Sequence, residues 1–226
     1  MNQESLFLES EGDAWFNRNR SANNEKKVHD LPDVRYLCDS LRSFSDQIGN
    51  VLEIGCSSGT KLEVICNTLG ARGRGVDPSE QAVAVGNDRL ARNEAQDIQL
   101  VQGTGKSLPF SSGSFDLVYF AFCLYLFDRS TLIQSLAEAD RVLKPGGFLV
   151  LTDFDPGSPR KRNYTHLDGI YSYKQNYAEF YTGTGLYFLV GKYSFSHRQN
   201  QFDVAAEERV STQILFKELD PLLTVS

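Results

Sequence analysis

A short apolar run that ends in a glycine-containing loop and continues into a helical pattern is the feature that most constrains this chain. Residues 50–54 read Asn-Val-Leu-Glu-Ile, the loop 55–60 follows, and apolar residues then recur at helical spacing up to Leu69. In an α/β sheet such a loop lets the backbone approach a ligand closely, and it turns the amide groups of the helix start toward that ligand. A strand, a binding loop and a helix are therefore predicted over residues 50–69.

Strand and helix patterns alternate as far as residue 155. Further strands are predicted at 74–77, 98–102, 115–120 and 148–152, and helices at 31–41, 79–92 and 131–143, with Lys144, Pro145, Gly146 and Gly147 ending the last of these. Such alternation is typical of a mostly parallel sheet with helices on both faces. The predicted fold class is α/β, a three-layer sandwich.

The length of 226 residues suits one α/β domain with appended segments, and 41% hydrophobic residues suffice for a buried core. We expect an N-terminal arm and helix at 1–49, the arm lying outside the core, and a ligand-binding core at 50–155. Residues 156–184 lose the alternation and are interpreted as a lid or substrate-facing insertion. The insertion carries Tyr164, Tyr171, Tyr173, Tyr177 and Tyr181. The runs 186–195 and 209–216, within 185–226, are expected to pair as antiparallel strands.

Composition narrows the class of partner. A net charge of −6 argues against a nucleic-acid partner, which usually meets a basic face. The four cysteines have no CxxC spacing and no neighbouring histidines, so no metal site is predicted and reduced thiols of a cytoplasmic protein are expected. No apolar stretch approaches the ~20 residues that cross a bilayer, and the acidic N-terminus does not resemble a signal peptide. Neither a membrane partner nor export is predicted.

The spacing within the loop excludes two nucleotide-binding motifs. It reads Glu53-x-Gly55-x-Ser57-x-Gly59, whereas the dinucleotide fingerprint GxGxxG requires glycine where Ser57 and Thr60 stand. The Gly-Lys-Ser/Thr of a nucleoside triphosphate loop is also absent from this stretch. A pyrophosphate cradle is therefore disfavoured.

The loop and the motifs that follow it resemble the class I S-adenosylmethionine-dependent methyltransferases, which have a Rossmann-like fold. The similar stretches occur in the family's order at residues 53–59, 76–79, 102–110, 115–118 and 141–147. Ser57 departs from the family's middle glycine. The resemblance implies S-adenosylmethionine as cofactor and a seven-stranded sheet whose C-terminal strand is antiparallel.

The resemblance also implies which residues hold the cofactor. They are Glu53, Gly55, Cys56, Ser57, Gly59, Asp77, Pro78, Gly103, Thr104, Gly105, Phe120, Ala121 and Phe122. Asp77 is expected to bind both ribose hydroxyls, since a carboxylate accepts two hydrogen bonds at once. Thr104 stands where the family usually has an acid that contacts the adenine amino group, and a threonine hydroxyl can accept one hydrogen bond.

Trp15 and Arg18 form an unusual cluster in an otherwise polar N-terminal arm. One interpretation is a staple that packs against the domain. The other is a lid over the cofactor, in which Arg18 meets a carboxylate, and on this interpretation both residues join the cofactor-binding set.

The expected activity is methyl transfer to an oxygen, nitrogen or carbon nucleophile of a small molecule, such as a sugar, a nucleotide-sugar or a secondary metabolite. Candidate catalytic residues are Tyr125, Asp153 and His166. Aromatic packing, a turn cap and an exposed histidine are the respective structural alternatives.

Basic residues at 160–162 lie in the insertion and could meet a negatively charged acceptor. Two other functions stay open from the sequence. One is a nicotinamide-dependent oxidoreductase, which shares the first strand–helix–strand unit. The other is a module that binds S-adenosylmethionine without turnover.

Overall fold

The computed structural model describes residues 3–19 and 28–220. Residues 1–2 and 20–27 of the predicted N-terminal segment, and residues 221–226 of the predicted C-terminal segment, lie outside the described residues. Among the described residues, no helix is both long and apolar enough to cross a membrane.

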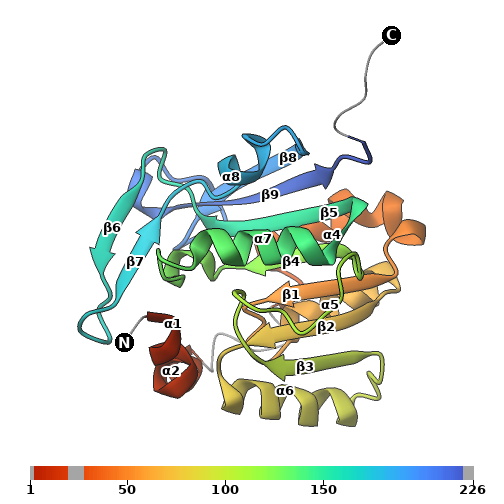
Figure 1. Ribbon diagram of the computed structural model, residues 1–226, viewed down its shortest axis with the longest axis horizontal. Coiled ribbons are helices and arrows are strands. Elements are labelled where there is room, and N and C mark those ends of the chain that lie inside the picture. The colour runs from red at the N-terminus through yellow and green to blue at the C-terminus, as the bar shows by residue number, and fades with distance from the viewer. Residues whose placement is uncertain (1–2, 20–27, 221–226) are drawn as a thin grey trace.

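A seven-stranded sheet organises the chain, with the strand order β3-β2-β1-β4-β5-β9-β8 (Figure 1). The strands are β1 (Asn50–Ile54), β2 (Arg72–Asp77), β3 (Ile98–Gln102), β4 (Phe115–Ala121), β5 (Leu143–Phe154), β8 (Tyr187–Ser196) and β9 (Arg209–Lys217). Each pair of neighbouring strands from β3 through β2, β1 and β4 to β5 is parallel. The strand β9 runs antiparallel to both β5 and β8. The predicted mostly parallel sheet with an antiparallel C-terminal strand is confirmed.

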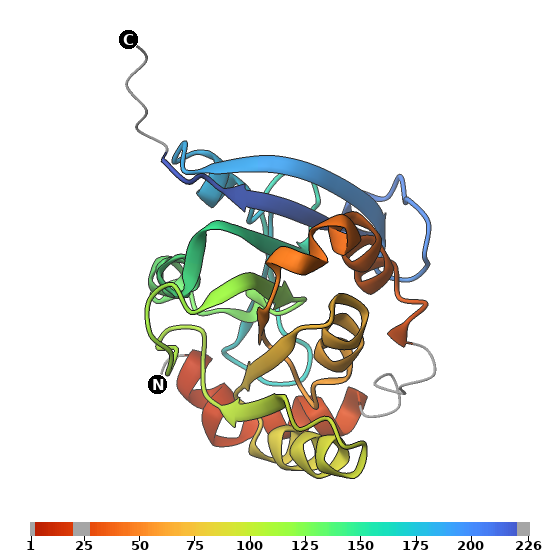
Figure 2. The same ribbon diagram turned by 90° about the vertical axis from the view of Figure 1, so that its right-hand side faces the viewer.

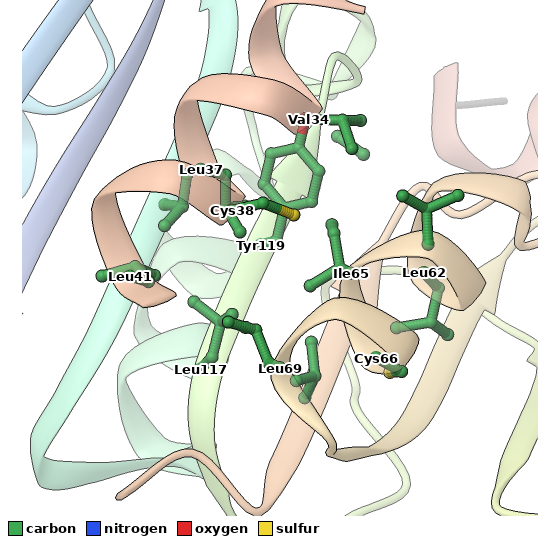
Figure 3. Packing of buried hydrophobic residues seen from close by; sticks show 14 of the residues in the cluster. Val34, Leu37, Cys38, Leu41, Leu62, Ile65, Cys66, Leu69, Leu117 and Tyr119 are labelled. Atoms are coloured by element: carbon green, nitrogen blue, oxygen red, sulfur yellow. The ribbon is translucent and has the colours of Figure 1, made fainter. Parts of the chain in front are cut away.

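Helices cover both faces of the sheet, as the three-layer prediction requires (Figure 2). One face carries α4 (Pro32–Leu41), α5 (Thr60–Leu69) and α6 (Glu80–Arg92), and the other carries α7 (Leu132–Val142) and the short α8 (Glu179–Thr182). Strand residues alternate between the two cores, since Val51 packs into the first and Leu52 into the second. In the first core, α4 and α5 pack together above Leu117 and Tyr119 of β4 (Figure 3).

The junction between α7 and β5 differs from the prediction. The helix ends at Val142, and β5 already begins at Leu143, so that residues 144–147 belong to the strand rather than to a loop. The pairing with β4 shifts register there, because Phe115 pairs with Leu143 and Leu117 with Phe148. Pro145 prevents the helix from continuing but does not prevent an extended strand with a bulge.

The N-terminal segment Gln3–Asn19 is helical and packed, which corrects the expectation of an arm outside the core. It comprises α1 (Gln3–Leu6), the π-helical turn Phe7–Glu11 and α2 (Gly12–Asn19), and Phe16 is 3% exposed. These helices lie beside the ends of β1, β2 and β3 toward which the strand arrows point, with α2 against α6 (Figures 1 and 2). We refer to this segment as the cover.

The insertion at 156–184 contains a second, two-stranded sheet that the sequence pattern did not predict. Its strands β6 (Arg160–Asn163) and β7 (Tyr171–Lys174) pair antiparallel. Farther along, the buried Tyr177 and Tyr181 pack into the core beside α7, and the Tyr181 hydroxyl donates to the carbonyl of Leu136 at 2.9 Å. Part of the insertion therefore fastens to the domain.

Candidate functional site

A pocket opens at the carboxyl ends of β1 to β4, between the sheet and the cover. It encloses about 820 Å³ of empty space, including its open mouth. It is lined by Glu4, Phe7, Gly12, Trp15, Ile54, Gly55, Val76, Asp77, Pro78, Gly103, Thr104, Gly105, Ala121, Phe122, Cys123, Leu126, Phe127, Asp128, Thr131 and Ser135. Open α/β sheets bind ligands at this edge.

Asp77 ends β2 at the centre of the pocket floor. Its Oδ2 accepts the backbone N–H of Ser57 at 2.7 Å, and its Oδ1 accepts the backbone N–H of Ser79 at 2.9 Å. Burial raises the pKa of Asp77 to about 6, against the lowering effect of these two hydrogen bonds. Each oxygen keeps a lone pair for a further donor, so the carboxylate is aimed and still able to accept two hydrogen bonds.

The loop after β1 adopts the shape of a glycine loop despite Ser57. This serine has φ +50°, in the left-handed region that glycine enters at lower cost. Its backbone N–H points at Asp77, as described above. The hydrogen bond holds Ser57 in this backbone conformation, which explains how serine fits the position of the family's middle glycine.

The cover sits directly on the turn between β2 and α6. The Asp13 carboxylate accepts the Ser79 hydroxyl at 2.6 Å and the Gln81 backbone N–H at 3.1 Å. Gly12 approaches so closely that an added Cβ would lie 3.1 Å from the Ser79 nitrogen. Asp13 thus supplies a side-chain cap to α6 from a distant part of the chain.

Gln3 fastens the other end of the cover. Its side-chain amide donates to the carbonyls of Leu126 (2.5 Å) and Tyr171 (2.9 Å) and accepts the Tyr171 backbone N–H (3.1 Å). Its backbone N–H donates to Asp128 at 2.8 Å. The cover is therefore bonded both to the loop after β4 and to the hairpin of the insertion.

The structure brings many of the predicted cofactor residues together at the pocket wall. Those that line it are Trp15, Gly55, Asp77, Pro78, Gly103, Thr104, Gly105, Ala121 and Phe122. Those outside the lining are Arg18, Glu53, Cys56, Ser57, Gly59 and Phe120. Glu53, 1% exposed, is buried behind the loop, where burial raises its pKa to about 8, and Phe120 is fully buried in the core.

Arg18 does not reach the pocket, although the cover itself does. Its guanidinium pairs with Glu11 of the same segment and donates to the Tyr164 hydroxyl at 2.9 Å. The Tyr164 hydroxyl in turn donates to Glu11 at 2.8 Å. The carboxylate that Arg18 meets is therefore part of a latch between cover and insertion.

None of the candidate catalytic residues lines the pocket. Tyr125 is half-buried and accepts a hydrogen bond from the Trp15 indole, and desolvation raises the pKa of its hydroxyl. Asp153 accepts the backbone N–H groups of Phe154 (2.7 Å) and Tyr125 (3.1 Å), and burial raises its pKa to about 8. His166 is exposed, with its ring 5.2 Å from that of Tyr164. The geometry gives Asp153 the role of a backbone support.

An aromatic cluster adjoins the pocket where β4 ends. Phe122 lines the pocket at φ +61° and contacts Tyr125 (5.4 Å between ring centroids) and Phe154 (5.0 Å). His197 stacks on Phe122 at 5.5 Å, and burial lowers the pKa of its imidazole. A bulky residue in the left-handed region is strained, and such strain concentrates at binding sites.

The basic residues of the insertion have partners within the protein, and their contact with an anionic acceptor stays a prediction. Arg160 and Arg162 both pair with Glu207, the first at 3.4 Å. Lys161 lies 3.6 Å above the ring of Tyr171. None of the three lines the pocket.

Sequence reasoning missed several lining residues. They are Glu4, Phe7, Gly12, Ile54, Val76, Cys123, Leu126, Phe127, Asp128, Thr131 and Ser135. Phe7 had a weak signal, as one of three successive apolar residues at 6–8 in a polar stretch. Glu4 had none, because its position depends on contacts with residues about a hundred positions away.

Comparisons with known proteins agree with this geometry. Residues 51–147 match the family model described as a methyltransferase domain. A demethylmenaquinone methyltransferase of Listeria monocytogenes is 33% identical over 123 residues, which cover 53% of this chain and 51% of that protein. The chain therefore spans about half the length of the curated relatives it matches.

Solved structures extend the likeness at the level of the fold. A Burkholderia thailandensis 1,6-didemethyltoxoflavin-N1-methyltransferase, bound to 1,6-didemethyltoxoflavin and S-adenosylhomocysteine, is 16% identical with a TM-score of 0.72, covering 95% of this chain and 88% of that one. The [4+2]-cyclase SpnF is 15% identical with a TM-score of 0.57, covering 80% and 81%. Because one neighbour is named a cyclase, this fold alone does not define the reaction.

Proposed function

We propose that this chain is a class I S-adenosylmethionine-dependent methyltransferase and that it transfers a methyl group from S-adenosylmethionine to a nucleophilic atom of a small molecule, as the family model that matches residues 51–147 and the similar proteins support. The observation that carries this proposal is the aimed carboxylate of Asp77 at the centre of the pocket floor. A carboxylate with one free lone pair on each oxygen suits the two adjacent hydroxyls of a ribose.

The donor set of the pocket fits the cofactor. Apolar side chains beside Asp77, among them Val76, Phe127 and Ile54, offer a surface for the adenine ring. The loop at Gly55 and the residues after β4 extend the site toward the aromatic cluster, which gives an elongated ligand room on both sides of the ribose. We therefore place the cofactor across the ends of β3, β2, β1 and β4.

The chain acts in this reaction chiefly by binding and orientation. S-adenosylmethionine supplies a methyl group made electrophilic by its sulfonium. The cover excludes water from the site, and Trp15 and Phe122 form the wall against which the acceptor is aligned. Asp153 keeps the backbone of Tyr125 in place through its hydrogen bond.

The acceptor suited to this wall is a planar ring. Trp15 and Phe122 line the pocket, Tyr125 and His197 pack against Phe122, and aromatic side chains at a pocket wall bind flat, partly apolar rings. The named acceptors of two similar proteins, demethylmenaquinone and 1,6-didemethyltoxoflavin, support a ring acceptor for this chain. A cytoplasmic site of action is proposed as well, supported by four cysteines that are all free thiols.

Calorimetric titration tests the proposal. We expect S-adenosylmethionine and S-adenosylhomocysteine to bind one site and NAD to leave no heat of binding. Binding of NAD without the other two would support an oxidoreductase instead. Binding of S-adenosylmethionine without methyl transfer to any acceptor in a panel of quinols and heteroaromatic rings would support a binding module.

A further inference from the structure

We propose that Glu4 in the cover selects the cofactor by accepting a hydrogen bond from the amino group of its adenine ring. The inference deepens the proposed function and rests on it. Glu4 lies outside the stretch that matches the family model, which begins at residue 51. A recognition residue would then come from outside the matched stretch.

One carboxylate oxygen in the pocket accepts no hydrogen bond from the described part of the chain. The carboxylates in the lining belong to Glu4, Asp77 and Asp128. Both oxygens of Asp77 accept backbone N–H groups, and both oxygens of Asp128 accept hydrogen bonds, from Gln3 and Ser130. Oε2 of Glu4 is buried and receives no hydrogen bond from residues 3–19 or 28–220. A buried acceptor without a donor is costly, and a bound ligand that carries a donor removes the cost.

Neighbouring residues hold the side chain of Glu4 in place. Its Oε1 accepts the hydroxyl of Thr104, the residue after the first glycine that follows β3. Gln3, the preceding residue, is fastened to Leu126 and Tyr171 as described above. The side chain is 13% exposed. The free oxygen is therefore fixed at the β3 end of the pocket before any ligand arrives, which reduces the entropy lost on binding.

The charges around Oε2 of Glu4 favour a neutral donor over a cation. Lys106 lies with its Nζ 3.8 Å from Oε2 of Glu4, too far for a hydrogen bond but close enough to balance the charge of the carboxylate. A second cation at this place, such as the ammonium of the cofactor, would be repelled by Lys106. A neutral N–H donor such as the adenine amino group would not.

The pocket wall beside Glu4 has a shape that fits a flat ring. At Gly105 an added Cβ would lie 2.8 Å from the Phe127 ring, so the ring packs directly against the backbone of the loop. Phe127 and Val76 line this end of the pocket. With Asp77 on the ribose, the β3 end lies on one side of the sugar and the aromatic cluster after β4 on the other. The flat base fits the β3 end, and the methyl group then faces the aromatic cluster after β4.

A ligand pair separates this role from a merely structural one. The probes are S-adenosylhomocysteine and its analogue in which unsubstituted purine replaces adenine, which lacks only the amino group. Calorimetry on the full chain should show the wild type binding the adenine ligand about 10- to 100-fold more tightly, the range for one hydrogen bond to a charged group. In Glu4→Ala the two ligands should bind within about threefold of each other.

Two further variants complete the experiment. Glu4→Gln retains the size of the side chain and a neutral acceptor, so we expect an intermediate preference, and it serves if the alanine variant does not fold. Glu9→Ala alters an exposed glutamate of the same segment and should discriminate as the wild type does.

The outcomes separate the two levels of the argument. A preference for the adenine ligand that is unchanged in both Glu4 variants overturns the role of Glu4 and leaves the proposed function standing, as does a wild type that binds both ligands equally. Failure of the wild type to bind either ligand overturns the proposed function, and the role of Glu4 with it.

Discussion

The floor of the pocket and its cover are held by different kinds of contact. Polar contacts on the floor are local: Asp77 is oriented by Ser79, two residues away, and by Ser57, twenty residues away. The cover is held by contacts that span the chain, from Asp13 to Ser79 over 66 positions and from Gln3 to Tyr171 over 168. The difference shows that a binding floor built from local contacts can be combined with a cover held by distant ones. The floor then defines the cofactor class, and the cover adjusts its recognition.

The largest expected effect tests the floor. Asp77→Ala removes the acceptor of both ribose hydroxyls, so we expect the affinity for S-adenosylhomocysteine to fall by about 100-fold or more. Calorimetry measures the affinity, and circular dichroism confirms that the variant is folded. An affinity within about threefold of wild type would contradict the ribose assignment.

The next largest expected effect is on stability and concerns the packing of α6 beneath the pocket floor. Gly86 of α6 faces Leu100 and the loop after β1, and an added Cβ would lie 2.6 Å from the carbonyl oxygen of Ser58. Gly86→Ala should therefore lower the free energy of unfolding by about 1–3 kcal/mol, although alanine favours helices. Urea unfolding measures it, with the exposed Asp88→Ala on the same helix as a near-neutral control. Stabilisation by Gly86→Ala would show that the floor tolerates expansion.

A substitution in the cover should have the opposite pattern to Gly86→Ala: it should lower the affinity for the ligand and leave the stability of the fold nearly unchanged. Gln3→Ala removes three hydrogen bonds to Leu126 and Tyr171. We expect the affinity for S-adenosylhomocysteine to fall by about 10-fold, because the cover must be reordered on binding, while Tm changes by less than about 2 °C. A loss of Tm as large as that of Gly86→Ala would mean that the cover is part of the cooperative core.

The smallest effect concerns pH. Burial raises the pKa of Asp77 to about 6, and the ionised carboxylate is the form that accepts two hydroxyl donors. Affinity for S-adenosylhomocysteine should thus be full above pH 7 and fall about fourfold between pH 7.5 and 5.5. Asp77→Asn, which does not titrate, should bind more weakly with no such dependence. An equal pH dependence in this variant would assign the titration to another group.

The sequence predicted the floor well because its signals are local. The strand Asn50–Ile54, the loop after it and Asp77 follow from apolar periodicity and turn residues that lie near one another in the chain. The strand β5 begins earlier than predicted because the pairing with β4 recruits residues 144–147, which no local pattern reveals.

The cover could not be predicted in the same way. Its helices are short and mostly polar, and they are held by distant partners rather than by an apolar stripe. Arg18 pairs with Glu11 and Tyr164 and does not line the pocket, so its role in cofactor binding stays a prediction. Trp15 lines the pocket, as the lid interpretation required, but the role of that interpretation in cofactor binding stays a prediction.

A crystal structure of the full chain with S-adenosylhomocysteine tests the central claim most directly. The account predicts the ribose hydroxyls on Asp77, the adenine ring beside Phe127 with its amino group on Glu4, and the sulfur facing Phe122 beneath the cover. Density for the ligand in the reverse direction, with its amino-acid end at Glu4, or outside this pocket, would contradict the account.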